Sequence, residues 1–160
     1  MYALLLLVSK FTKGNEKDKR SIYKLYLNNT NYINSWDLVD SSAYQIVGAY
    51  LEDQDKQILC QLAKSDSLWE RRIAIISTYQ FIKNNQFTEA LDISKQLIND
   101  DEDLIHKAVG WMLREVGNRD VAVEKDFLIS HSQQMPRTML RYAIEKFPER
   151  ERKRYLRGTV

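Results

Sequence analysis

The chain has 160 residues, a net charge of +2, five glycines, two prolines and one cysteine. This length is enough for one domain with a hydrophobic core, and we expect residues 1–160 to form a single domain. The scarcity of glycine and proline argues against an all-β fold, which needs many turns. The lone cysteine excludes an internal disulfide and a cysteine-rich zinc site, and it is typical of the reducing cytoplasm, where we place the protein.

Apolar residues recur at helical spacing along the chain, without the sustained alternation typical of strands. The pattern predicts nine or ten helical segments, at roughly 2–12, 16–32, 35–51, 54–64, 67–83, 87–98, 102–117, 120–131, 136–147 and 149–157. The apolar run at 2–8 is too short to cross a bilayer and lacks the features of a secretory signal, so we expect a buried helix there and no membrane association. Helices joined by short links, two in about 40 residues, indicate an all-α superhelix of stacked antiparallel helix pairs, of the HEAT-like or armadillo type.

Basic residues gather at the C-terminal end. Residues 137–160 hold eight basic and three acidic side chains, so this end carries +5 while residues 1–136 carry −3. Such a segment can bind phosphates. Basic residues also favour helix C-termini and solvent, and charge alone favours that simpler explanation.

The three tryptophans, Trp36, Trp69 and Trp111, are 33 and 42 residues apart. They fall near the start or middle of alternate predicted helices, at 35–51, 67–83 and 102–117. Equivalent positions in stacked helix pairs lie on one side of the stack, so we expect all three rings on the concave side of the superhelix. For a single tryptophan such as Trp111, a place in the core is the simpler explanation.

Two charged residues accompany these tryptophans. Asp40 lies one helical turn after Trp36 on the same face, among apolar neighbours where an unpaired carboxylate is costly. The pattern alone slightly favours a structural aspartate that bridges to a neighbouring helix. Arg72 precedes an apolar run and needs an anion, either Asp40 or a phosphate. We interpret Arg71 as a solvated partner of Glu70 or of another exposed acid.

A glycine stands before the third tryptophan, in the middle of a predicted helix. Gly110 costs about 1 kcal/mol relative to alanine there. Close approach of a neighbouring helix or of a ligand backbone would justify that cost. Arg114 follows Trp111 by one turn.

The signatures of cofactor and metal chemistry are missing from the sequence. There is no phosphate-binding glycine loop and no dinucleotide fingerprint. His106 and His131 have no partners at metal-ligand spacing, and His131 falls in a predicted loop. Cys60 is expected to be a small core residue. We therefore expect neither a metal nor an organic cofactor.

Four segments together resemble a known family. They are SWDLVDSS at 35–42, LWERRIA at 68–74, KAVGWMLRE at 107–115 and MPRTMLRYAIEKF at 135–147. In this order they are similar to the AlkD-type DNA alkylation repair family over nearly the whole chain. The resemblance implies a HEAT-like superhelix with a basic groove for double-stranded DNA that contains alkylated bases. It further implies a DNA glycosylase that removes cationic alkylpurines, such as N3-alkyladenine and N7-alkylguanine, without a base-flipping pocket.

The resemblance also implies roles for five residues. By motif position, Asp40 would be the catalytic carboxylate, and Trp36 and Trp111 the aromatic walls against the sugar of the lesion. Arg72 would hold the DNA backbone and Arg114 would contact a further phosphate. The chemistry is consistent, because a carboxylate stabilises the oxocarbenium character that builds as an N-glycosidic bond breaks. No lysine stands beside Asp40 in these motifs, so we expect base removal without strand cleavage.

Family members usually carry several helices before the segment that matches residues 2–7. We therefore expect the chain to lack the family's N-terminal helices, which leaves residues 4–7 partly exposed. We expect a monomer, with a dimer through this exposed helix as the alternative.

Two non-catalytic functions compete with the glycosylase. One is a helical-repeat scaffold that binds a protein through the tryptophans. The other is a DNA-binding module without excision activity. Convergence of Trp36, Asp40, Arg72 and Trp111 on one basic concavity would favour the enzyme, whereas Asp40 in a sealed core would exclude it.

Overall fold

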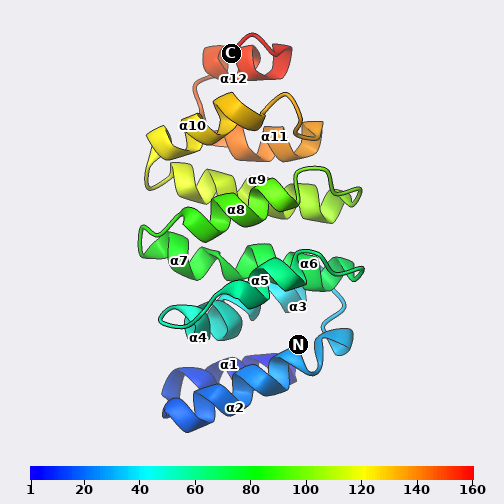
Figure 1. Cartoon of the computed structure of the whole chain (residues 1–160), viewed down its shortest axis with the longest axis vertical. Helices are drawn as coiled ribbons and strands as arrows, with labels where there is room; N and C mark the ends of the chain where they lie inside the picture. The colour runs from blue at the N-terminus through cyan, green and yellow to red at the C-terminus, as the bar shows by residue number, and fades with distance from the viewer.

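The computed structural model describes residues 1–160, and its regular elements are all helical (Figure 1). The α-helices are α1 (Tyr2–Lys13), α2 (Glu16–Leu27), α3 (Trp36–Asp40), α4 (Ala49–Leu51), α5 (Gln57–Leu62), α6 (Leu68–Ser77), α7 (Tyr79–Lys83), α8 (Thr88–Gln96), α9 (Asp103–Gly117), α10 (Val121–His131), α11 (Arg137–Ala143) and α12 (Glu149–Arg157). Two 3₁₀ turns, η1 (Thr30–Tyr32) and η3 (Ile144–Lys146), and one π-helical turn, η2 (Tyr44–Gly48), join them. None of the helices combines the length and apolar character needed to cross a membrane.

The helices stack in chain order along the long axis of the molecule (Figure 1). Helices α3, α6, α9 and α11 pack successively against one another and form one row, which we call the site layer together with η2 and α7. Helices α5, α8 and α10 pack against members of this row, and α12 packs against α11. The predicted all-α helical-repeat fold is thereby confirmed.

Polar side chains fix the start of several helices. The amide of Asp18 donates to the Asn15 side chain (3.0 Å), and the Asn15 amide donates to the Asp18 carboxylate (3.3 Å), so the two form a capping box at α2. At α10, Asp120 accepts from the amides of Ala122 and Val123. These contacts satisfy backbone donors that a helix start would otherwise leave unpaired.

The prediction of unbroken helices at 35–51 and 67–83 is wrong. After α3 the Ser42 hydroxyl donates to the carbonyl four residues before it (2.5 Å), and the π-helical turn follows. Between α6 and α7 the hydroxyls of Ser77 and Thr78 donate to carbonyls four and three residues before them (2.6 and 2.7 Å). Hydroxyl bonds to the preceding turn compete with the helical ladder and bend it, and neither glycine nor proline marks the break.

A single cluster of 37 buried apolar residues runs through the stack, so the layers share one core. The first helix contributes little to it. Phe11 is the one buried residue of α1, while Leu5 and Leu6 are 48% and 45% exposed. The expectation of a buried first helix is therefore wrong for most of its length, and the expected exposure around residues 4–7 is present.

Candidate functional site

The site layer contains a pocket of about 330 Å³. Four successive helices of the layer line it: Trp36 and Asp40 from α3, Arg72 from α6, Leu104, Lys107, Trp111 and Arg114 from α9, and Tyr142 from α11. All five residues singled out in the sequence line this one pocket. A larger hollow, of about 600 Å³, lies beside α1 and α2 around Lys10, Lys13 and Asp18, and it contains none of them.

A two-point ion pair fixes the carboxylate in this pocket. Arg72 Nε donates to Asp40 Oδ1 (2.9 Å) and Arg72 Nη2 donates to Asp40 Oδ2 (2.8 Å). Arg72 Nη1 donates to the Leu104 carbonyl, which ties the pair to α9. Arg72 is only 5% exposed, whereas the Asp40 side chain is 18% exposed. Arg72 thus fixes the orientation of the carboxylate, which remains accessible from the pocket. Asp40 is therefore not sealed in the core.

The two indoles of the pocket differ in exposure and contacts. Trp36 is 57% exposed and stands at the mouth of the pocket. Trp111 is partly buried, its Nε1 donates to Glu115 (3.2 Å), and its ring centroid lies 6.1 Å from that of Tyr79. Trp69 packs against the core and does not line the pocket, so only two of the three tryptophans share it.

Each cation of the pocket has an acidic partner. Arg72 pairs with Asp40, and Arg114 pairs with Glu145 in η3, which follows α11. Lys107 pairs with Asp103 one turn earlier on α9 (2.7 Å), and this hydrogen bond raises the pKa of Lys107. The pocket is therefore lined by more basic than acidic residues, but none of its cations is free of a partner.

Gly110 explains how Tyr142 reaches the pocket. A Cβ at position 110 would lie 2.4 Å from the Met139 carbonyl oxygen and 2.5 Å from the Tyr142 Cβ. The missing side chain lets α11 approach α9 at a distance that alanine would not allow. The predicted close approach of a neighbouring helix is confirmed.

Three of the pocket residues were not predicted from the sequence. Leu104 and Lys107 stand seven and four residues before Trp111, so helical spacing already placed them on its face. Tyr142 lies in the C-terminal motif, but no local pattern indicates its contact with the pocket.

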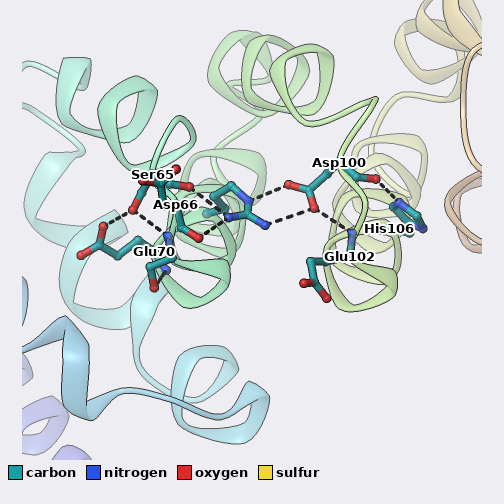
Figure 2. A network of polar contacts seen from close by, with 8 residues as sticks. Ser65, Asp66, Glu70, Asp100, Glu102 and His106 are labelled. Carbon is teal, nitrogen blue, oxygen red and sulfur yellow. Dashed lines mark hydrogen bonds and ion pairs between the residues drawn. The ribbon is translucent and has the colours of Figure 1, made fainter.

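A polar network anchors α6 beside the pocket (Figure 2). Arg71 Nε donates to Asp100 Oδ2 (2.6 Å) and its Nη2 donates to Oδ1 (3.3 Å), while its Nη1 donates to the carbonyls of Ser65 and Asp66 (3.0 Å each). Asp100 in turn accepts from the Glu102 amide (2.9 Å). The side chains of Arg71 and Asp100 are only 16% and 6% exposed. The prediction of a solvated Arg71 is therefore wrong.

The residue before Arg71 joins α6 to the segment that leads into α3. The hydroxyl of Thr30, in η1, donates to Glu70 Oε1 (2.7 Å), and that of Ser65 donates to Glu70 Oε2 (2.5 Å). Glu70, Arg71 and Arg72 thus reach in turn to the segment before α3, to the segment before α9, and to the pocket. Three consecutive residues of α6 set the relative positions of the pocket walls.

The histidines and the cysteine lie outside the pocket. His106 Nε2 lies 2.5 Å from the Asp100 carbonyl oxygen (Figure 2). His131 is the last residue of α10, so its predicted place in a loop is wrong. Cys60 is partly buried and packs against the core. No group of three or more His, Cys, Asp and Glu side chains is arranged to hold a metal ion.

Comparison with models of protein families matches residues 1–147 to the family described as DNA alkylation repair enzyme. The match includes every residue that lines the pocket. Neither the curated proteins nor the solved structures contain a match to this chain.

Proposed function

The chain belongs to the DNA alkylation repair enzyme family, and on this premise we propose that it is a monofunctional DNA glycosylase. Its substrate would be duplex DNA with positively charged alkylpurines, such as N3-alkyladenine and N7-alkylguanine, whose N-glycosidic bond it hydrolyses. One observation carries the proposal. The carboxylate of Asp40 is fixed by two hydrogen bonds from Arg72 and remains open to a pocket with Trp36 and Trp111 in its walls.

The chemistry needs a carboxylate in this setting. As the bond to the base breaks, positive charge develops on the sugar, and a fixed carboxylate stabilises that charge and orients the attacking water. An alkylated purine is already cationic, so it leaves as a neutral base without a general acid. Asp40 is the one acidic residue that lines the pocket, and a single carboxylate suffices for this reaction.

The other pocket residues support substrate binding in this proposal. Indole faces attract cationic groups, so Trp36 and Trp111 suit a sugar or base that carries positive charge. Arg72 acts through Asp40, whose orientation it fixes. Arg114 is paired with the half-exposed Glu145 and can exchange that partner for a phosphate. The hydrogen bond to Asp103 raises the pKa of Lys107, so its amine stays protonated and is poorly suited to Schiff-base chemistry, in line with base removal without strand cleavage.

The test is release of bases from two duplexes, one methylated and one containing uracil. We expect release of N3-methyladenine and N7-methylguanine, no release of uracil, and abasic sites in strands that stay intact until alkali is added. Equal release of the neutral base would contradict the proposed use of a cationic leaving group. If a folded chain binds duplex DNA and releases no base, the DNA-binding module without catalysis is the correct alternative.

A further inference from the structure

A second cluster of aromatic and basic side chains adjoins the pocket through Trp111. The ring of Tyr79, already in contact with Trp111, meets the ring of Tyr44 edge-on at a centroid distance of 5.2 Å. Lys83 Nζ lies 5.0 Å from the Tyr44 ring centroid and 5.7 Å from that of Tyr79. The Arg119 guanidinium carbon lies 5.8 Å from the Tyr79 centroid. We call Tyr44, Tyr79, Lys83 and Arg119 the tyrosine cluster.

The tyrosine cluster continues the surface of the site layer. Tyr44 begins η2, which follows α3, and Tyr79 and Lys83 stand one turn apart on α7, which follows α6. Arg119 lies two residues after the end of α9. Helix α7 packs against both η2 and α9. The cluster therefore lies where η2, α7 and the end of α9 come together, next to the pocket. A long ligand seated over the pocket can pass on to this cluster.

The distribution of charge distinguishes the cluster from the pocket. The pocket cations, Arg72, Lys107 and Arg114, are all neutralised by acids. Lys83 is exposed and takes part in none of the ion pairs of the chain. The Arg119 side chain is 24% exposed, and its Nη1 donates to the carboxylate and to the carbonyl oxygen of Glu115, four residues before it (3.1 Å each). An arriving anion therefore meets a free ammonium at Lys83 beside the partly exposed guanidinium of Arg119.

The aromatic rings hold these cations in place. An ammonium or guanidinium within about 6 Å of a ring centroid is attracted by the ring. Lys83 is attracted by two rings, which reduces the side-chain freedom that a flexible lysine would lose on binding a phosphate. Fixed cations that point to solvent next to a substrate pocket are suited to phosphodiester oxygens.

We propose that Lys83 and Arg119 form a phosphate-binding site that grips the DNA backbone beside the lesion. The proposal rests on the proposed function, which identifies the polyanion as duplex DNA. A duplex carries one negative charge per about 1.7 Å of its axis, so a segment seated over the pocket necessarily presents phosphates to the adjoining surface. Sequence-independent affinity then comes largely from the tyrosine cluster, with Arg114 as a further phosphate contact, and the other pocket residues recognise the damaged nucleoside.

The experiment measures binding of unmodified duplex DNA, by fluorescence anisotropy, as a function of salt. The variants are Lys83→Gln and the double variant Lys83→Gln/Arg119→Gln. The logarithm of the association constant falls linearly with the logarithm of the salt concentration. Each lost phosphate contact should make this slope shallower by about 0.9 and weaken binding roughly 3- to 10-fold near 0.1 M salt. In excision assays KM should rise by a similar factor while kcat stays unchanged.

Lys95→Gln is the matched control. Lys95 is exposed, lies on α8 outside the site layer, and forms no ion pair, so its loss removes one charge without touching the cluster. The inference is overturned if the double variant, folded by circular dichroism, binds DNA with the slope and affinity of Lys95→Gln. It is also overturned if the parent chain binds no duplex DNA. Because unmodified DNA is used, a chain that binds as expected but excises nothing refutes only the proposed function.

Discussion

Replacement of Arg72 by methionine tests whether the Arg72–Asp40 pair organises the pocket. Methionine keeps much of the length and the apolar stem but removes every donor. The two hydrogen bonds to Asp40 and the bond to the Leu104 carbonyl are lost. Asp40 is left as a largely buried carboxylate without its counter-charge.

The structure sets the size of the effect. Removal of one partner from a buried ion pair costs about 3–5 kcal/mol, because the other charge stays buried and uncompensated. The Asp40 side chain keeps 18% exposure, so water screens part of that cost. We expect a loss of about 2–4 kcal/mol in the free energy of unfolding, which lowers Tm by roughly 5–15 °C for a chain of this size. Arg72→Lys keeps the charge but not the two-point contact, and should cost about 1–2 kcal/mol.

The assay is urea and thermal denaturation of the parent, Arg72→Met, Asp40→Asn and the double variant. If the pair is as described, the double variant is more stable than the sum of the single effects predicts, by at least about 1 kcal/mol. A cost below 0.5 kcal/mol for Arg72→Met, or simple additivity of the two changes, would refute the reasoning.

Three further predictions concern single residues. Gly110→Ala should lower the free energy of unfolding by about 1–3 kcal/mol despite its better helix propensity, because the new methyl group collides with α11; urea denaturation measures this. Burial raises the pKa of Glu124 to about 8. The folded chain therefore keeps a proton that the unfolded chain loses near pH 4.5, and stability should fall as pH rises from there to 8, by at most about 1.4 kcal/mol per pH unit. Glu124→Gln should flatten that slope in denaturation experiments at several pH values. Trp36→Ala should change stability by less than about 1 kcal/mol, because the ring is exposed, yet slow base release roughly 10-fold.

Most of the helices could be predicted because apolar residues recur at helical spacing along them. Helix α9 is the clearest case, expected at 102–117 and found at Asp103–Gly117. The breaks after Asp40 and at Thr78 could not be predicted in the same way. They depend on hydroxyls that bond back to the preceding turn, and serine and threonine also occur in unbroken helices.

Five of the eight residues that line the pocket were predicted, and Asp40 was one of two partners expected for Arg72, but the sequence could not decide between them. The spacing of Trp36 and Asp40 showed that they share a face, while the pattern alone could not separate a catalytic carboxylate from a structural one. The bond from Arg72 to Asp40 spans 32 residues and depends on how α6 lies against α3. Arg71 looked like a surface residue because its partner Asp100 is remote in sequence. Such pairings are set by tertiary packing, which the local periodicity of a sequence does not report.

Trp69 shows the limit of an argument from repeat length. A period of about 40 residues predicts which helix carries a tryptophan, but not which residues of that helix line the pocket. In α6 it is Arg72 that lines the pocket, while Trp69 packs against the core.

The central claim is that Asp40 is the carboxylate that drives base release. The direct measurement is the single-turnover rate of N7-methylguanine release from methylated duplex DNA by the parent, Asp40→Asn and Asp37→Asn. Asp37 is the matched control, since its carboxylate lies on the same helix, accepts from the Ser35 hydroxyl and does not line the pocket. We expect release by Asp40→Asn to be at least roughly 100-fold slower at unchanged DNA affinity, and release by Asp37→Asn to be near the parent's rate. Release at the parental rate by a folded, DNA-bound Asp40→Asn variant would contradict the central claim.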